Sequence, residues 1–176
     1  MILNVIPEKC TGCMACEVVC SLAHEGKIVP HLSRIRILRS ENGSVILPVV
    51  CPPCDEKTCI QVCPEEGAIQ LTTKGAVIIN EALCTGCSKC IRACPLGAVF
   101  FHSLPGRGKH GKAIVLKCDQ CGDDPLCVKV CSMGALVAKH DSERLGLHDL
   151  ERMHALRRQV EESLEFTVNG HPRRLE

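Results

Sequence analysis

The sequence predicts an α+β fold of small repeated modules, in which short antiparallel hairpins and small helices surround grouped cysteines. A C-terminal helix and a short strand are expected to follow these modules. Three observations lead to this prediction. The chain of 176 residues contains sixteen cysteines, and these fall into four closely spaced groups of four. Short apolar runs lie between the groups. With three Phe and no Tyr or Trp, few large side chains are available to fill a conventional core.

The four cysteine groups, here called motifs one to four in chain order, share one spacing with small variations. Motifs one and three are spaced C-x2-C-x2-C-x3-C, whereas motifs two and four lengthen the middle gap to four and five residues. A proline follows the last cysteine of motifs two and three. The members are Cys10, Cys13, Cys16 and Cys20; Cys51, Cys54, Cys59 and Cys63; Cys84, Cys87, Cys90 and Cys94; and Cys118, Cys121, Cys127 and Cys131.

This spacing is that of bacterial ferredoxins, whose cysteines ligate [4Fe-4S] clusters. Each cluster takes four thiolates, so sixteen cysteines with none left over predict four [4Fe-4S] clusters. In such a motif three cysteines bind one cluster, while the fourth ligates the other cluster of a pair. The repeated units are therefore expected to be tandem bacterial ferredoxin-like modules.

Two other uses of grouped cysteines fit this sequence less well. A disulfide framework belongs mainly to secreted chains, and nothing before Cys10 resembles a secretory signal. A structural zinc-binding protein is the alternative from another class of function. However, structural zinc sites usually combine two well-separated C-x2-C pairs rather than four cysteines in one short run.

The apolar runs between the motifs predict short strands in antiparallel pairs. Their positions are Val45–Val50, Ala76–Ile79 and Ala113–Leu116. A Gly-Ala dipeptide plus an aliphatic residue also follows the last cysteine of three motifs, which indicates duplication of an ancestral two-motif unit. These repeats are Gly67-Ala68-Ile69, Gly97-Ala98-Val99 and Gly134-Ala135-Leu136.

An insertion at about residues 21–50 separates motifs one and two. It contains Asn42-Gly43 between two mainly apolar stretches, which is a strong hairpin signal. Alternation along the first stretch would place Arg34 and Arg36 on one face, with Arg39 near the turn. These arginines could form a docking patch for a partner or a solvated strand face.

The cysteines end before residue 140, so residues 1–140 are expected to form the four-cluster domain and residues 141–176 a C-terminal extension. Apolar residues recur at helical spacing over 147–164 and predict an amphipathic helix. Glu165–Val168 then looks extended, and Asn169-Gly170 predicts a turn. The extension could cover the domain's own core, dock onto a catalytic partner, or join copies of the chain head to tail.

Several classes of function are excluded by what the chain lacks. The formal net charge is +1, but four oxidised clusters with their thiolates, at about −2 each, would take it to roughly −7. The basic residues then compensate the clusters or serve in docking, and no nucleic-acid partner is expected. No apolar stretch approaches the roughly 20 residues of a membrane span. There is no Rossmann or P-loop glycine pattern, and the eight histidines are scattered. We therefore expect a non-catalytic chain without further cofactors or catalytic residues.

The four-motif layout resembles the polyferredoxin electron-transfer subunits of formate dehydrogenases, DMSO reductase-type molybdoenzymes, hydrogenases and carbon monoxide dehydrogenase systems. The resemblance covers about residues 1–140 and rests on all sixteen cysteines. Within this family, the segment Cys16–Ile37, with His24-Glu25-Gly26 and Ser33-Arg34-Ile35, is most similar to small subunits that accompany tungsten aldehyde:ferredoxin oxidoreductase-type enzymes.

The resemblance implies a cytoplasmic electron-transfer subunit of an oxidoreductase complex in anaerobic metabolism. It would relay electrons between a catalytic subunit and a flavin subunit or ferredoxin. A tungsten- or molybdenum-pterin aldehyde oxidoreductase is the first candidate for the catalytic subunit. A carbon monoxide dehydrogenase, formate dehydrogenase or hydrogenase is the alternative.

The resemblance also implies a nested wiring, in which motif one shares clusters with motif four, and motif two with motif three. The ligands would be Cys10, Cys13, Cys16 and Cys131 for cluster A; Cys118, Cys121, Cys127 and Cys20 for cluster B; Cys51, Cys54, Cys59 and Cys94 for cluster C; and Cys84, Cys87, Cys90 and Cys63 for cluster D. The duplication pattern also allows the other wiring, motif one with two and motif three with four. Pro64 and Pro95 favour the nested wiring, because they mark motifs two and three as an ordinary ferredoxin pair, whereas Ser21 and Ser132 replace them elsewhere.

Overall fold

A computed structural model describes residues 2–52, 54–102, 107–139 and 147–165, with the last helix described at side-chain level over 151–162. The expected turn at Asn169-Gly170 lies outside the described residues. So does the expected strand Glu165–Val168, except for Glu165, which ends the last helix. The α+β fold class is confirmed.

The strands of the described residues form four two-stranded antiparallel sheets. The pairs are β1 (Ile2–Val5) with β8 (Leu136–Lys139), β2 (Arg36–Arg39) with β3 (Ile46–Val49), β4 (Ile69–Leu71) with β5 (Val77–Ile79), and β6 (Val99–His102) with β7 (Ile114–Lys117). Three pairs lie between the end of one motif and the start of another, and β8 returns the chain from motif four to β1, just before motif one. The β2–β3 pair is the expected insertion hairpin, although its first strand begins at Arg36 and leaves Arg34 outside.

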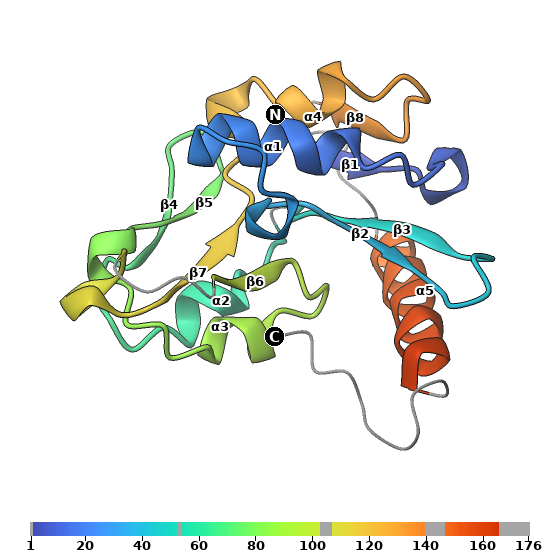
Figure 1. The fold of residues 1–176 in the computed structure, drawn as a ribbon. Helices are drawn as coiled ribbons and strands as arrows, with labels where there is room; N and C mark the ends of the chain where they lie inside the picture. The colour runs from blue at the N-terminus through green and yellow to red at the C-terminus, as the bar shows by residue number, and fades with distance from the viewer. Residues whose placement is uncertain (1, 53, 103–106, 140–146, 166–176) are drawn as a thin grey trace.

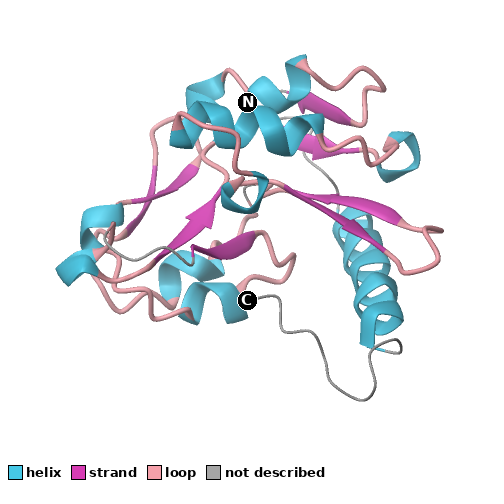
Figure 2. Ribbon diagram, in the orientation of Figure 1, coloured by secondary structure: helices cyan, strands magenta, loops and turns pink. Residues whose placement is uncertain are grey.

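Four short helices carry the third cysteine of each motif, and the first of them also carries Cys20 (Figure 2). They are α1 (Ala15–Glu25), α2 (Thr58–Gln61), α3 (Lys89–Ala93) and α4 (Leu126–Lys129). Short 3₁₀ turns complete the connections at Pro7–Lys9, Pro30–Leu32, Glu81–Leu83, Lys109–Gly111 and Gln120–Asp123.

The motifs associate in two halves, which Figure 1 shows one above the other. Helices α1 and α4 pack together in the upper half, so motifs one and four are neighbours. Helices α2 and α3 pack together in the lower half, so motifs two and three are neighbours. Contacts between β5 and β7 add to the packing near the junction.

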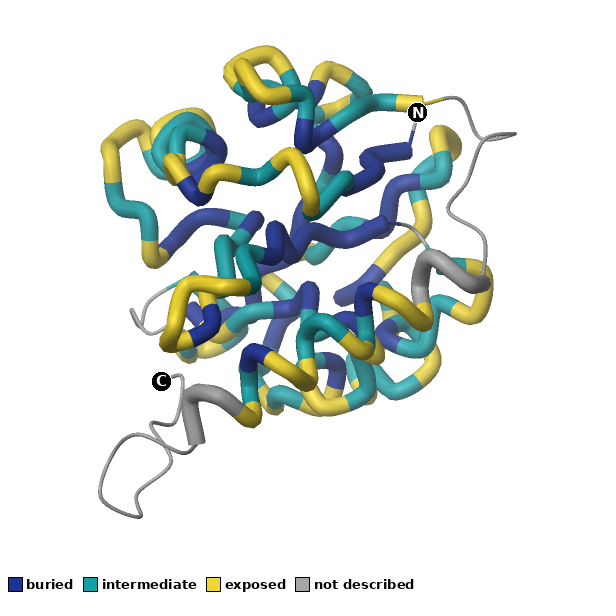
Figure 3. Tube along the Cα trace, turned by 90° about the vertical axis from the view of Figure 1, so that its right-hand side faces the viewer, coloured by how far each residue is buried: buried dark blue, intermediate teal, exposed yellow. Residues whose placement is uncertain are grey.

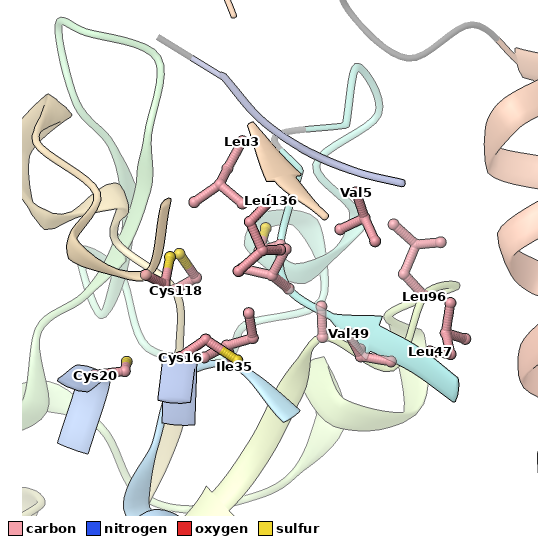
Figure 4. Packing of buried hydrophobic residues seen from close by; sticks show 14 of the residues in the cluster. Leu3, Val5, Cys16, Cys20, Ile35, Leu47, Val49, Leu96, Cys118 and Leu136 are labelled. Atoms are coloured by element: carbon pink, nitrogen blue, oxygen red, sulfur yellow. The ribbon is translucent and has the colours of Figure 1, made fainter. Parts of the chain in front are cut away.

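Buried segments run through the middle of the molecule (Figure 3). Most of the buried hydrophobic residues are aliphatic, and eight cysteines are buried with them. One buried group includes Leu3, Val49 and Leu136 together with Cys16 and Cys118 (Figure 4). A second group combines strand residues of β5, β6 and β7 with cysteines of motifs two and three. Since sulfur atoms complete both groups, metal bound at the cysteines would complete the core of both halves.

The C-terminal helix α5 (Leu147–Glu165) packs beside the β2–β3 hairpin (Figure 1). Met153 is buried in the first core group, and Leu156 packs against it. Val160 is also buried. Of the roles considered for the extension, α5 therefore fills at least one, which is to cover the chain's own core. None of the described helices has the length and apolar character needed to cross a membrane.

Candidate metal centres

Three cavities are each lined by four cysteines, three from one motif and one from another. The first quartet, quartet A, is Cys10, Cys13, Cys16 and Cys131. Quartet B is Cys20, Cys118, Cys121 and Cys127. Quartet D is Cys63, Cys84, Cys87 and Cys90. None of the sixteen cysteines, all of which lie in the described residues, forms a disulfide.

The remaining four cysteines form quartet C, which consists of Cys51, Cys54, Cys59 and Cys94. Burial raises the pKa of the Cys59 thiol, and the other three thiols of the quartet raise it further because they lie close by. Motif one thus meets motif four, and motif two meets motif three. This is the grouping that the nested wiring requires, while ligation by these quartets stays a prediction.

Left-handed backbone conformations turn the chain around the quartets. Seven described residues other than glycine have positive φ angles, and six of them lie inside cysteine motifs: Met14, Lys57, Ser88, Gln120, Cys121 and Asp123. Each such residue costs roughly 1–2 kcal/mol. Strain concentrated in this way is typical of functional sites, where the chain direction must aim particular side chains. Here the left-handed residues turn the chain so that the first three thiols of a motif line the same cavity in motifs one, three and four.

Backbone N–H groups donate hydrogen bonds to several of the sulfur atoms. Ala98 N–H donates to Cys94 Sγ at 3.3 Å and Ala135 N–H to Cys131 Sγ at 3.2 Å. Both alanines belong to the Gly-Ala repeat, and in the third copy Ala68 N–H donates to the Glu65 carbonyl oxygen instead. N–H···S bonds of this kind help to set the reduction potential of an iron–sulfur cluster.

Burial makes several of the quartet thiols harder to deprotonate. It raises the pKa of the Cys16, Cys90 and Cys127 thiols to about 12, with neighbouring acidic groups and thiols adding to the effect. Metal binding therefore has to displace protons from these thiols. Four convergent sulfur atoms are the donor set of a [4Fe-4S] cluster, and also of a tetrahedral zinc site. The residues present fit either metal centre.

A polar group beside quartet B was not predicted from the sequence. His24 lies one helical turn after Cys20 and hydrogen-bonds to the Cys20 carbonyl oxygen at 2.8 Å and to Asp119 at 3.2 Å. Asp119 also accepts a bond from Arg34 Nη1 at 2.6 Å. The bonds to Asp119 and Cys20 raise the pKa of His24 to about 10. The Cys20-x3-His24 spacing on α1 was the available signal.

The three arginines of the insertion, which the sequence allows as a docking patch or as a solvated strand face, all make contacts within the chain. Arg34 pairs with Asp119, and its Nη2 lies 3.7 Å from Glu81. The Arg36 guanidinium lies over the Phe100 ring, 5.1 Å from its centre. Arg39 donates to the Gly12 carbonyl oxygen in motif one. These side chains hold the insertion against the cysteine motifs.

Two of the sixteen cysteines are exposed, Cys13 in quartet A and Cys87 in quartet D. Each is the second cysteine of a C-T-G-C turn. Near quartet A the exposed neighbours include Met14 and Met133. The other members of both quartets are intermediate or buried. Quartets A and D therefore each have one sulfur at the protein surface.

Comparisons with known proteins distinguish between an iron–sulfur cluster and a zinc site. The family described as "4Fe-4S dicluster domain" matches residues 42–141, and that described as "4Fe-4S binding domain" matches residues 7–23. This chain belongs to the 4Fe-4S dicluster domain family. It is an iron–sulfur protein, and the zinc alternative is therefore not supported.

Two relatives, named as a polyferredoxin-like subunit and as an electron transport protein, agree with this assignment. The polyferredoxin-like subunit of an aliphatic sulfonate oxidoreductase from Pyrococcus furiosus is 41% identical over 127 residues, covering 72% of this chain and 69% of the relative. The electron transport protein HydN of Escherichia coli K12 is 35% identical, covering 74% and 82%. Among solved structures, the BamBC active-site complex of benzoyl coenzyme A reductase matches at 30% identity, covering 77% and 76%, with a TM-score of 0.42. The resemblance to polyferredoxin electron-transfer subunits is confirmed, whereas the tungsten partner stays a prediction.

Proposed function

We propose that this chain is a non-catalytic electron relay that holds four [4Fe-4S] clusters, one at each cysteine quartet, in the nested wiring. The observation that carries the proposal is the assembly of all sixteen thiols into four groups of four, with none left over. Bound clusters supply one-electron redox chemistry. The protein supplies the sulfur ligands, the N–H···S hydrogen bonds and a mostly buried path.

The proposed relay runs in the order A, B, C, D. Quartets A and B exchange their fourth cysteines, Cys131 and Cys20, and quartets C and D exchange Cys94 and Cys63. Quartets B and C share no motif, but Cys51 and Cys118 lie close enough for each thiol to affect the other's ionisation. The exposed cysteines Cys13 and Cys87 then belong to the two terminal quartets, where electrons would enter and leave.

The proposed partners are the catalytic subunit of a multi-subunit oxidoreductase at one end and a flavin subunit or ferredoxin at the other. Support comes from relatives named as an oxidoreductase subunit and as an electron transport protein. We favour a tungsten- or molybdenum-pterin aldehyde oxidoreductase in the cytoplasm, on the resemblance of the segment Cys16–Ile37. A carbon monoxide dehydrogenase, formate dehydrogenase or hydrogenase is the second candidate.

Anaerobic purification tests the cofactor content directly. The protein should contain about sixteen iron atoms and matching sulfide per chain, and reduction should produce the EPR signals of [4Fe-4S] clusters. Four zinc atoms without visible absorption would contradict the proposal, and about eight iron atoms would contradict the count.

Affinity purification from the native source tests the partners. A pterin enzyme that co-purifies with the chain would support the favoured partner, whereas a nickel enzyme would support a hydrogenase or carbon monoxide dehydrogenase. Turnover of aldehyde, carbon monoxide or formate by the isolated chain would contradict a non-catalytic role. Head-to-tail association of copies is a separate hypothesis, which light scattering of the purified chain checks. The buried face of α5 is already used within one chain, so any such contact would have to use other residues.

A further inference from the structure

A buried lysine lies at the junction between the two halves. Lys117 is the last residue of β7, directly before Cys118, and is only 5% exposed. Its Nζ donates to the carbonyl oxygens of Val77 at 2.9 Å and of Cys118 at 3.1 Å. Burial of an ammonium group costs several kcal/mol unless nearby groups compensate it. This position therefore calls for negative charge close to Lys117.

The groups that can compensate Lys117 are cysteines of two different quartets. Burial raises the pKa of the Cys51 and Cys59 thiols of quartet C, and the nearby Lys117 lowers both, so the lysine lies close to this quartet. It acts in the same way on Cys118 of quartet B. Among the described residues, Lys117 is the one buried lysine. It thus lies where quartets B and C meet, the one step of the proposed row at which no motif is shared.

Carboxylates near Lys117 are bound to other cations. Asp119 and Glu81 line the same polar cavity as Lys117, together with Arg34. Asp119 binds Arg34 and His24, while Glu81 binds Arg107 at 2.7 Å. None of the hydrogen bonds described for Lys117 Nζ goes to a carboxylate. The charge that Lys117 compensates is therefore that of the sulfur ligands.

We propose that Lys117 is a shared fixed cation that raises the reduction potentials of clusters B and C above those of clusters A and D. This inference rests on the four-cluster function proposed above. Reduction adds one negative charge to a cluster and its ligands, and a cation in contact with those ligands stabilises that charge most strongly in a low-dielectric interior. In each transfer one cluster gains the single electron that its neighbour loses, and no proton moves. Electrons would therefore collect at the junction between the halves before they leave through A or D.

Substitutions that separate charge from hydrogen bonding test the proposal in the full, iron-loaded chain. Lys117→Gln keeps a donor for the Val77 carbonyl oxygen but removes the charge, whereas Lys117→Arg keeps the charge. Lys129→Gln is the matched control, because Lys129 is exposed, pairs with Asp124 and lies two residues after Cys127. Iron content and EPR-monitored redox titration are measured for each variant and for the wild type.

In Lys117→Gln, two of the four clusters should shift to more negative potentials. The expected change is at least tenfold in their reduced-to-oxidised ratio, which corresponds to about 59 mV for a one-electron couple. The other two clusters should titrate as in the wild type. Lys117→Arg and Lys129→Gln should leave all four potentials near their wild-type values.

Several outcomes would overturn the inference. It is wrong if no cluster shifts in Lys117→Gln, if all four shift equally, or if the Lys129→Gln control shifts the same pair. It is also wrong if both Lys117 variants lose iron, because Lys117 would then be needed for assembly rather than for potential. Failure of the proposed function looks different, since the wild-type chain would then lack four clusters before any variant is compared.

Discussion

Quartets A and D form the two ends of the proposed relay and start from the same C-T-G-C turn, yet their surroundings differ. In both, the glycine of the turn and the residue after the second cysteine have positive φ angles: Gly12 and Met14 at one end, Gly86 and Ser88 at the other. The second cysteine is exposed at both ends. The local sequence thus produces the same backbone turn and the same exposed second cysteine twice.

The residues around the two turns are of different kinds. Near Cys13 the surface includes the apolar Met14 and Met133, and the following helix α1 has eleven residues. Near Cys87 the following helix α3 has five residues, and the exposed Lys89 and Lys112 give a basic surface. The same cysteine turn therefore lies in two different surroundings, so the two ends of the proposed relay would present different surfaces to a partner.

Removal of iron should have the largest effect on the fold, and it should affect the quartet A end and the quartet D end alike. Cysteines complete both core groups, and α1 to α4 are too short to be stable alone in water. We expect apoprotein with reduced thiols to lose most of its secondary structure, measured by far-UV circular dichroism. A cooperative thermal transition retained by the apoprotein would contradict this, and retention of one half only would show that the two ends fold independently.

Loss of a fourth ligand should damage one end at a time. Under the nested wiring, Cys131→Ala removes a ligand of cluster A, and Cys63→Ala removes a ligand of cluster D. Each variant should lose up to about four of sixteen iron atoms. Alkylation followed by mass spectrometry should then find newly reactive thiols in motif one for Cys131→Ala and in motif three for Cys63→Ala. Newly reactive thiols at Cys10, Cys13 and Cys16 in the Cys63→Ala variant would favour the other wiring. Newly reactive thiols at Cys51, Cys54 and Cys59 would show that motif two completes its own cluster, which would also contradict the nested wiring.

Local sequence patterns were sufficient to predict part of the fold. The Asn42-Gly43 turn predicts the β2–β3 hairpin, because its two strands are neighbours in the chain. Helical spacing of apolar residues predicts α5. In contrast, Ile2–Val5 was not predicted as a strand, since its partner is Leu136–Lys139, more than 130 residues away. A strand of four residues carries little signal until its partner is known.

The same distinction holds at the candidate site. The cysteine motifs are local and were visible, whereas the groups that surround them come together only in the folded chain. His24 meets Asp119 from a different motif, and Lys117 lowers the pKa of the Cys51 thiol of motif two, which burial raises. A lysine at the end of the apolar run before Cys118 was a signal that could have drawn attention to this position.

Truncation of a buried side chain on α5 should affect the two ends unequally. Met153 belongs to the core group that contains Cys16 of quartet A and no cysteine of quartet D. Met153→Ala should therefore lower stability by about 2–5 kcal/mol, mainly in the half that holds quartets A and B. Cluster loss in increasing denaturant, followed by visible absorption and EPR, measures this. Gln159→Ala, at an exposed position of α5, is the control and should change little.

Alanine at the equivalent glycines should give a smaller effect that again differs between the ends. Both substitutions force a positive φ angle on alanine, at a cost of roughly 1–2 kcal/mol. At Gly86 the new Cβ would also overlap the backbone carbonyl oxygen of Ala113, whereas at Gly12 it would meet only the side chain of Arg39, which can move. Gly86→Ala should therefore lower the denaturation midpoint more than Gly12→Ala. Equal midpoints would show that the loop before β7 adjusts freely.

Removal of positive charge near the quartet D end should give the smallest effect, a change in the rate of electron exchange with charged dyes. Lys109 pairs with Glu65 at 2.7 Å and lowers the pKa of that carboxyl, and Lys112 lowers it further. Because Glu65 lines the quartet D cavity together with Cys87, these lysines lie near the exposed cysteine. A basic surface raises the local concentration of anionic redox partners, and salt screens it over about 10 Å at 0.1 M. The double variant Lys89→Gln/Lys112→Gln should slow electron exchange with an anionic dye a few-fold at low salt, with little change for a neutral dye. Lys27→Gln, at another exposed lysine, serves as the control. If the anionic dye reacts as fast with the double variant as with the wild type, electrons exchange mainly through the Cys13 end, and the basic surface near Cys87 does not guide the partner.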